Sequence, residues 1–484
     1  MAKSVKVNYA LNLTNIVLGI IFPLITFPYV TRILSPGGIG QVQFYSSIIE
    51  YVTLFTSLGI PLYAVREVAK VRDNKNACNK LTAEILTLHL LLSLVGYVAI
   101  GVLALTVAKI QENIALFLIL SLAIILNTIG TSWFFQAVED FTYITIRSLF
   151  VRIFSLALLF IMVKDANDLI PYGIVLTCGS AGNNIFNFIR LRKYISIKDF
   201  NSGLQPFQHI VPTLKIFLLN VTIGIYTQLS AVLLGFLQSN EAVGYYAMPQ
   251  KIVTVILTMV TALSGVLLPR LSNYIGQNNT EQFKQLGNKA ISFVLALTMP
   301  IAVGLILLAK PITVVLFSET YLQSYPVLII WAPIIAIIGL SQVYGKSILY
   351  STGHEMLMTL CTLMGMLAYL AVGIPGIMKY SIYGAAAASF CAEVVVTLSM
   401  MILGKKYHPC TIFRKENLTY ILAALAMAVP VLFCTLFKSN VLQIVIGIPI
   451  GALTYFTILV IKKDSFYLEI KKAIMSNSSF ASEK

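Results

Sequence analysis

The sequence has very little charge. Only 11% of its 484 residues are Asp, Glu, Lys or Arg, whereas 58% are hydrophobic and the mean hydropathy is +0.86. A soluble globular chain carries about 25% charged residues, so this chain has too few to cover the surface of a water-soluble protein. The composition also excludes a disordered chain, a collagen-like chain and a disulfide scaffold. What remains is a polytopic membrane protein with lipid as its outer solvent.

Motifs of catalysis and metal binding are also missing. The six cysteines include no CxxC pair, and the four histidines include no HExxH pattern or Cys/His cluster, so we expect neither disulfides nor a metal site. The chain has no GxxxxGK[ST] loop, which excludes an ATP-driven engine. We expect no enzyme activity and no cofactor beyond a coupling ion. The basic residues that give the net charge of +15 lie between apolar runs, where they are typical of membrane orientation. We therefore expect no nucleic acid partner.

Apolar runs long enough to cross a bilayer dominate the chain. About 20 helical residues span the hydrocarbon core. Eleven runs of at least 18 residues contain no Asp, Glu, Lys or Arg: 7–31, 85–108, 113–138, 169–189, 216–240, 252–269, 290–309, 320–345, 356–378, 417–437 and 439–461. Three further apolar stretches contain isolated charges: 33–65, 141–163 and 380–404. Together they predict an all-α polytopic membrane protein with 14 transmembrane helices, the first one retained rather than cleaved as a signal peptide.

Lys and Arg are unevenly distributed among the predicted loops. With the N-terminus in the cytoplasm, 26 of the 34 Lys and Arg residues lie in inward-facing segments, six lie in outward-facing segments and two lie within helices. Positive charge is enriched in cytoplasmic loops. The distribution therefore predicts that both termini are cytoplasmic and that the number of helices is even.

Two short outward-facing turns resemble each other at a constant offset of 204 residues. Residues 33–40 (ILSPGGIG) precede the second helix, and residues 237–244 (LQSNEAVG) precede the eighth, with Gly40 matching Gly244. Helices 1–6 and 7–12 then have the same orientation, as in the parallel repeats of some transporters. We expect two parallel six-helix lobes followed by two extra helices and a cytoplasmic tail: an N-lobe of residues 1–208, a C-lobe of 209–404 and an appendix of 405–484.

Charged side chains inside the predicted spans are candidates for a transport pathway. A charge at mid-bilayer costs about 2.5–3.5 kcal/mol on insertion scales, so such residues tend to be functional. We expect a central cationic cavity that binds an anionic substrate, formed by Arg152, Lys251, Arg32, Arg270 and Arg147. For Arg32, Arg270 and Arg147, an alternative is an anchor at the membrane surface.

Other polar side chains complete the candidate site. The residues expected to line the cavity are Asn12, Asn15, Asn220 and Gln228. Glu50 and Glu393 are candidates to bind a coupling proton or sodium ion. The alternative for all of these charges is that they pair with one another and only hold the lobes together.

Several motifs resemble those of one family. They are residues 22–34 (FPLITFPYVTRIL) followed by Gly38-Ile-Gly40, residues 58–72 (LGIPLYAVREVAKVR), residues 133–139 (WFFQAVE) with Arg147 after them, and residues 243–247 (VGYYA) followed by Lys251. With these motifs the chain resembles the Wzx-type polysaccharide flippases of the multidrug/oligosaccharidyl-lipid/polysaccharide exporter superfamily. The resemblance covers at least the first twelve predicted helices. It implies a fold like that of the MATE multidrug transporters.

The resemblance also implies a function. The chain would move undecaprenyl-diphosphate-linked oligosaccharides, such as O-antigen, capsule or exopolysaccharide repeat units, across the bacterial inner membrane by alternating access. The implied partners are the lipid-linked oligosaccharide, the bilayer, a polysaccharide polymerase and a chain-length regulator. Alternatives within the superfamily are a lipid II flippase and a cation-coupled multidrug antiporter, although an antiporter should present acids rather than cations. From another class, a channel or a non-transporting scaffold is disfavoured by the repeat and by the charges inside the spans.

Overall fold

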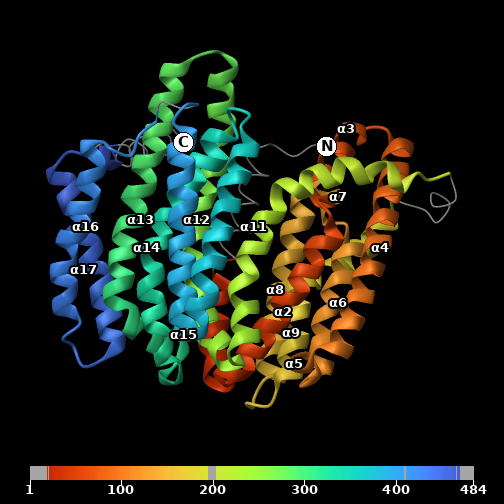
Figure 1. Ribbon diagram of the computed structural model, residues 1–484, viewed down its shortest axis with the longest axis horizontal. Helices are drawn as coiled ribbons and strands as arrows, with labels where there is room; N and C mark the ends of the chain where they lie inside the picture. Colours follow the sequence, from red (N-terminus) through yellow and green to blue (C-terminus); the bar gives the residue numbers. More distant parts are fainter. Residues whose placement is uncertain (1–18, 20, 195–202, 408–409, 465, 469–484) are drawn as a thin grey trace, which may run out of the picture. The chain divides into compact units, whose positions relative to one another are not determined.

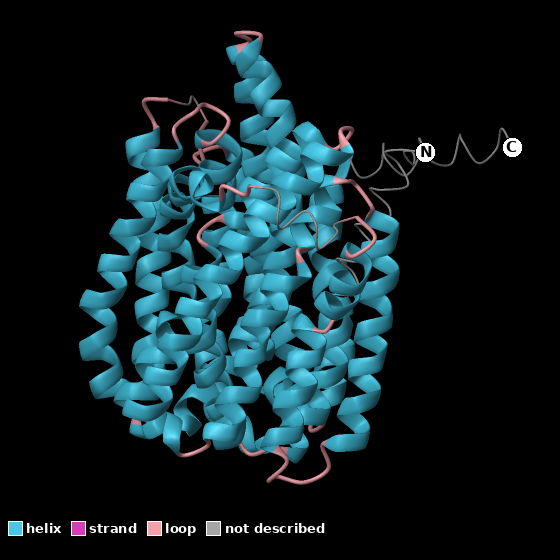
Figure 2. Ribbon diagram, turned by 90° about the vertical axis from the view of Figure 1, so that its right-hand side faces the viewer, coloured by secondary structure: helices cyan, strands magenta, loops and turns pink. Residues whose placement is uncertain are grey.

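Most of the residues that the structure describes are helical. The computed structural model describes residues 19, 21–194, 203–407, 410–464 and 466–468, and within these it contains helices, turns and loops but no strand (Figure 2). The all-α class predicted from the sequence is confirmed. By their internal contacts the residues form two compact units, Met1–Gly244 and Tyr245–Lys484.

The N-terminal unit is a helix bundle, coloured from red to yellow-green in Figure 1. A short apolar helix, Ile21–Ile33, comes first. The helices that follow are α2 (Pro36–Ser57), α3 (Ile60–Val71), α4 (Lys75–Thr106), α5 (Ala108–Gln111), α6 (Ile114–Gly130), α7 (Ser132–Ala137), α8 (Phe141–Met162), α9 (Leu169–Ala181), α10 (Asn183–Leu191), the 3₁₀ helix η2 (Pro206–His209) and α11 (Ile210–Leu237). α2 packs against α4, α6 and α11, and α8 packs against α9.

The C-terminal unit is a second bundle, coloured from green to blue in Figure 1. α12 (Asn240–Gly276) begins in the first unit and continues into the second. The elements that follow are α13 (Thr280–Phe317), η3 (Glu319–Ser324), α14 (Tyr325–Ser341), the π-helix η4 (Gln342–Leu349), α15 (Glu355–Gly404), α16 (Lys415–Cys434) and α17 (Asn440–Ile461). α13 packs against α14, α16 and α17.

Short polar side chains begin several of these helices. The Oγ atom of Ser35 accepts a hydrogen bond from the backbone N–H of Gly38, with Pro36 in the first turn of α2. Asn74 and Asn113 cap α4 and α6 in the same way. Such caps satisfy N–H groups that lack a partner within the helix, and Pro suits the first turn because it has no N–H to leave unpaired. The ends of these helices are therefore encoded locally.

Helix is present in each of the fourteen predicted stretches. Nine helical segments within the described residues are long and apolar enough to cross a membrane, and four shorter apolar helices accompany them. The predicted eleventh and twelfth spans form the single helix α15, interrupted at Ser381, where φ is 50°. The predicted second and fourth spans are each broken in two by left-handed residues, Leu58 with Gly59 and Thr131. The count of fourteen membrane spans stays a prediction.

Large apolar side chains lie on the outside of the N-terminal bundle. On α4, Leu94, Val98 and Leu105 are 65%, 64% and 77% exposed, whereas Ile85 and Leu88 on the same helix are buried. A stripe of this kind would be unfavourable in water, because each apolar side chain gains free energy on leaving it. The exterior therefore has the character expected of a surface that faces acyl chains.

The two turn motifs related by the 204-residue offset meet each other. A Cβ atom on Gly40 would lie 1.6 Å from the carbonyl oxygen of Asn240, and a Cβ atom on Gly244 would lie 2.0 Å from the carbonyl oxygen of Pro36. Pro36 and Asn240 are themselves 204 residues apart, so the contact is reciprocal. Only glycine fits at either position, because any side chain would overlap a backbone carbonyl group. The weak sequence repeat thus coincides with a pair of equivalent close approaches.

Gly40→Ala and Gly244→Ala are each expected to lower the unfolding temperature of the purified protein. Side-chain rotation cannot relieve an overlap with a backbone carbonyl, and overpacking costs about 1–3 kcal/mol. Gly101→Ala on α4 is the matched control, because nothing lies within 4 Å of a Cβ atom at that position. Equal unfolding temperatures for the three variants would show that the close approach does not exist.

Candidate functional site

Arg147, on α8, is buried inside the N-terminal unit. Only 9% of the residue is exposed. Its Nη1 donates a hydrogen bond to Oδ1 of Asn187 on α10, and its guanidinium carbon lies 5.3 Å from the centre of the Tyr143 ring. This burial argues against a role for Arg147 as an anchor at the lipid headgroups.

The Arg147 contact continues into a chain of amide and hydroxyl groups. Nδ2 of Asn187 donates to Oγ of Ser132 at 3.1 Å, Ser132 donates to Oδ1 of Asn184 at 2.9 Å, and Nδ2 of Asn184 donates to Oδ1 of Asn127 at 2.7 Å. In the part of the chain that the structure describes, Arg147 forms no ion pair with Asp or Glu. The network therefore orients the guanidinium without neutralising its charge.

Two polar atoms of the Arg147–Tyr143 pair are buried without a hydrogen-bond partner among the described residues: Nε of Arg147 and the hydroxyl of Tyr143. Further such atoms belong to residues that neighbour the amide and hydroxyl chain in the sequence: Oγ1 of Thr131, Nε1 of Trp133 and Oδ1 of Asn183. Four of these five atoms can donate a hydrogen bond. A buried cation with an unsatisfied N–H beside an unsatisfied hydroxyl is a setting that favours an anionic oxygen, because charge-assisted hydrogen bonds are the strongest that a protein makes.

Arg152 lies five residues further along α8, and its guanidinium lies close to Gly19. A Cβ atom on Gly19 would lie 3.6 Å from Nη2 of Arg152 and 3.8 Å from its Nη1. The Arg152 side chain is half-buried. Of the polar residues predicted to line the cavity, Asn12 and Asn15 lie outside the described residues, as does the side chain of Asn220.

Two of the predicted site residues contact each other within the N-terminal unit. Nε2 of Gln228 on α11 donates a hydrogen bond to Oε2 of Glu50 on α2. Oγ of Ser47 donates to Oε1 of the same Gln228 at 3.1 Å, and Nε2 of Gln43 donates to Ser47 at 3.3 Å. One polar strip therefore joins α2 to α11. It contains Glu50, which was predicted to bind an ion, and Gln228, which was predicted to line the cavity.

The remaining predicted residues lie on three helices. Arg32, near the end of the first helix, is exposed, and its Nη1 donates to the carbonyl oxygen of Pro28 at 2.6 Å. On α12, Lys251 is half-buried and Arg270 is exposed. Glu393, on α15, is half-buried. Lys251, Arg270 and Glu393 thus belong to the C-terminal unit.

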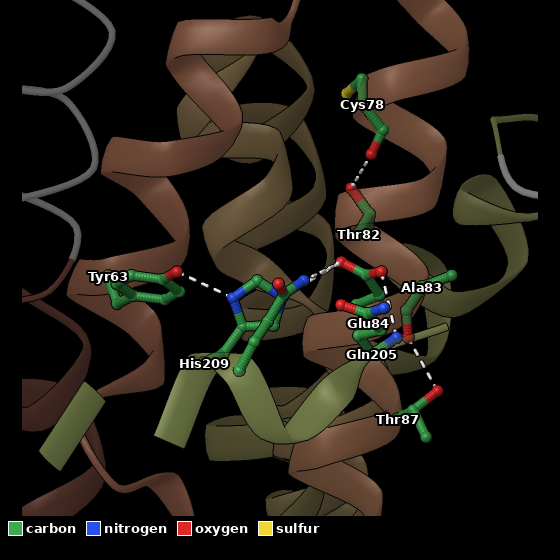
Figure 3. A network of polar contacts seen from close by, with 9 residues as sticks. Tyr63, Cys78, Thr82, Ala83, Glu84, Thr87, Gln205 and His209 are labelled. Carbon is green, nitrogen blue, oxygen red and sulfur yellow. Dashed lines mark hydrogen bonds and ion pairs between the residues drawn. The ribbon is translucent and has the colours of Figure 1, made fainter. Parts of the chain in front are cut away.

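Tyr63, Glu84 and His209 form a buried polar group that was not predicted from the sequence (Figure 3). Glu84 directly precedes the apolar run 85–108, and His209 lies between two predicted spans, so both appeared to be loop residues. The two residues are 125 positions apart in the chain. No local pattern signals such a contact.

Two cavities within the C-terminal unit could hold ligands. One of about 310 Å³ has an apolar lining from α13, α16 and α17 that includes Leu308 and Met427. The other, of about 510 Å³, is lined by polar and charged side chains that include Lys284, Lys289 and Arg414. Within the residues that the structure describes, no three His, Cys, Asp or Glu side chains gather where they could bind a metal ion.

The sequence model of the family described as "Polysaccharide biosynthesis protein" matches residues 5–275, more than half of the chain. The chain therefore belongs to this family. Two curated proteins, each named "Putative O-antigen transporter", are similar to it. The protein from Shigella dysenteriae is 24% identical over 387 residues, covering 79% of this chain and 95% of that protein. The one from Escherichia coli K12 is 21% identical over 392 residues, covering 79% and 92%.

Solved structures share the fold. The lipid II flippase MurJ in an inward closed conformation superposes with a TM-score of 0.67 and 18% identity, covering 93% of this chain and 99% of that one. An inward-facing MATE family multidrug transporter of the MOP superfamily gives a TM-score of 0.62 and 13% identity, covering 84% and 95%. At this level of identity the likeness shows the fold alone, and it confirms the MATE-like architecture predicted from the sequence.

Replacing Arg147 with Met is expected to destabilise the protein, and the effect of Asn187→Ala should depend on whether Arg147 is present. Leaving one partner of a buried hydrogen bond unpaired costs about 1–3 kcal/mol, and contacting residues show interaction energies of about 0.5–3 kcal/mol. Unfolding of the wild type, the two single variants and the double variant measures both quantities. Ile146→Ala, at an exposed neighbouring position, is the control. Strictly additive effects would contradict the contact.

Proposed function

We propose that this chain is a flippase that moves lipid-linked polysaccharide units, O-antigen units among them, from the inner to the outer leaflet of the bacterial inner membrane. Membership of the polysaccharide biosynthesis family and similarity to two proteins named as O-antigen transporters support the substrate class. The fold shared with a lipid II flippase and a multidrug transporter supports a carrier rather than a channel or a scaffold.

The substrate explains why a carrier is needed. An oligosaccharide has many hydroxyl groups, and each costs several kcal/mol, roughly 2–7, to move into an apolar medium unpaired. Spontaneous flipping is therefore very slow. A polar path through the protein removes this barrier, because its side chains and water replace the lost hydrogen bonds. The lipid tail can remain in the bilayer while the headgroup moves.

The observation that carries the proposal is the pair of arginines on α8. Arg147 is buried beside the Tyr143 hydroxyl with its own Nε unsatisfied, and Arg152 lies half-buried close to Gly19. A diphosphate is an anion that guanidinium groups bind with two parallel hydrogen bonds. We assign diphosphate binding to Arg147 and Arg152, together with Lys251, Arg32 and Arg270. The sugar hydroxyls would form hydrogen bonds with the predicted polar side chains of the cavity, which are Asn12, Asn15, Asn220 and Gln228.

The apolar cavity between α13, α16 and α17 suits the other end of the substrate. Its lining is formed by aliphatic, Met and aromatic side chains, with Leu308, Met427 and Tyr455 among them. A section of isoprenoid chain would lose no hydrogen bonds there. This assignment favours a substrate linked to undecaprenyl diphosphate over a free sugar.

Transport would proceed by alternating access, with the headgroup exposed first to the cytoplasm and then outside. An inside-negative membrane potential favours outward movement of the anion by about 2.3 kcal/mol per charge per 100 mV. Glu50 and Glu393 are the candidates to bind a coupling proton or sodium ion. The hydrogen bond that Glu50 accepts from Gln228 connects a candidate ion site to a residue of the proposed path.

Two alternatives belong to the same superfamily. A lipid II flippase would carry a different headgroup on the same type of lipid, and the family match and the named relatives favour polysaccharide units over it. A cation-coupled multidrug antiporter would present acids to its substrate, whereas α8 presents arginines. The candidate protein partners are a polysaccharide polymerase, which consumes the flipped unit, and a chain-length regulator.

Both termini of the chain are expected on the cytoplasmic side. Fusions of reporters that are active only inside or only outside the inner membrane, placed after Lys6 and after Lys463, should report the cytoplasm at both sites. The same reporters placed after Lys164 and Lys438 should report the outside, because those loops carry little positive charge. Opposite locations for the two termini would mean an odd number of spans and would contradict the predicted topology.

Arg152→Ala and Lys251→Ala are each expected to slow flipping of a fluorescent lipid-linked oligosaccharide in reconstituted vesicles. Loss of a hydrogen bond to a charged group costs about 1.5–3 kcal/mol, which corresponds to about ten-fold or more in rate. Arg152→Lys should retain part of the activity, since it keeps the charge. The measurement is protection of the headgroup from an added quencher over time.

Lys164→Ala is the control for this experiment, because Lys164 is an exposed cation in the connection that follows α8. All variants must reach the membrane in equal amounts. Headgroup movement that does not depend on the protein would refute the flippase assignment. Wild-type rates for both Arg152→Ala and Lys251→Ala would remove these two residues from the mechanism.

A further inference from the structure

The start of α11 is held by three ionisable side chains that are almost completely buried (Figure 3). Glu84, His209 and Tyr63 are 4%, 4% and 6% exposed, and they come from α4, η2 and α3. All three lie in the N-terminal unit. His209 is the last residue before α11, so the contact is made where the chain enters that helix.

The geometry places one ring nitrogen of His209 against each of the other two residues. The hydroxyl of Tyr63 lies 2.8 Å from Nδ1 of His209, and Oε2 of Glu84 lies 3.2 Å from its Nε2. The Glu84 carboxylate also accepts hydrogen bonds from the backbone N–H of Gln205 at 3.2 Å and from Nε2 of Gln208 at 3.0 Å. These hydrogen bonds from the segment that leads into α11 thus converge on a single carboxylate of α4.

Few other charges reach this site from the α3 side. Arg66 and Glu67, further along α3, act electrostatically on the Tyr63 hydroxyl and are of opposite sign. Arg66 is itself paired with Glu67 at 2.8 Å. η2 contributes only the side-chain amide of Gln208 and the imidazole of His209, and α7, which packs on α3, has no ionisable side chain.

The α4 and α11 sides add no compensating cation. Lys80, one turn before Glu84, and Lys215 on α11 are both exposed, and among the described residues His209 is the only ion-pair partner of Glu84. α6 has no ionisable side chain. Glu50 of α2 contacts α11 about five turns further along. Lys109 of α5 binds carbonyl oxygens at the opposite end of α11.

Both protonation states of His209 fit the hydrogen bonds, but they differ in charge. A neutral imidazole donates from Nε2 to Glu84 and accepts at Nδ1 from Tyr63, which leaves one buried negative charge. A protonated imidazole donates from both nitrogens, and the Glu84–His209 pair is then neutral overall. A buried charge without a compensating partner is strongly unfavourable, so a proton on His209 stabilises the assembled contact.

We propose that Glu84 and His209 form a proton-binding site that fastens the start of α11 to α3 and α4 and loosens when the proton leaves. The fastened state is favoured at low pH and is lost as the pH rises, because the fastened contact binds one more proton than the loosened one. α11 also carries Gln228, which holds Glu50. On the proposed function, on which this last step rests, proton release frees α11 for the conformational change of transport.

Hydrogen exchange of the full-length protein in nanodiscs tests the proposal without any substrate. After correction for intrinsic rates, backbone exchange in residues 203–215 should increase by roughly ten-fold or more between about pH 5 and 8. His209→Gln should abolish this pH dependence. His354→Gln is the matched control, because His354 lies in the C-terminal unit and is bonded to Thr352. The same pH dependence in His209→Gln as in the wild type would overturn the proposal.

A second variant keeps the test decisive if His209→Gln does not fold. Glu84→Gln keeps the shape of the side chain but removes the buried negative charge, so a neutral His209 no longer leaves an uncompensated charge and the rise of exchange with pH should disappear or reverse. A rise of exchange with pH equal to that of the wild type would overturn the proposal. Exchange that does not rise with pH would overturn the proton site and leave the flippase assignment untouched. Exchange that rises with pH, in a protein that moves no headgroup in vesicles, would refute the flippase assignment and retain the proton site.

Discussion

Polar groups inside a membrane-spanning bundle must find their partners within the protein, because lipid offers none. The fold meets this constraint for the backbone because most of the described residues are helical. For side chains it uses pairs drawn from distant segments: Arg147 with Asn187, Glu50 with Gln228, and Glu84 with His209. A charged side chain inside a span is unfavourable even when it is hydrogen-bonded, so such residues are the candidates for a role in transport.

The positions of the helices could be predicted from the sequence because hydrocarbon thickness sets a minimum length for an apolar run. The breaks within helices could not. Leu58 and Thr131 adopt left-handed conformations although neither residue favours them, and Ser381 does the same within α15. Close packing explains the first break, since a Cβ atom on Gly59 would lie 2.8 Å from the carbonyl oxygen of Thr213 on α11. Gly59 and Pro61 are local signals of this first break, whereas the tertiary contact that requires it cannot be read from the sequence.

The candidate site was partly predictable for the same physical reason. Arginines and acids within apolar runs are conspicuous, because insertion penalises them. Their partners are ordinary amides that have many possible roles: Asn187 orients Arg147, and Gln228 is bonded to Glu50 rather than only lining a path. Glu84 was missed because it stands at the edge of an apolar run, where a charge is unremarkable until the chain folds back onto it.

The central claim is that the cations within the spans meet water and the anionic headgroup during transport. Thiol labelling tests it most directly, with Arg152→Cys and Lys251→Cys placed separately in a background whose six native cysteines are replaced. The account predicts that a charged, membrane-impermeant reagent modifies both positions and that lipid-linked oligosaccharide slows the reaction. Leu94→Cys, on the exposed apolar face of α4, should stay unmodified. Unreactive cysteines at 152 and 251, or reaction rates that the substrate does not change, would contradict the account.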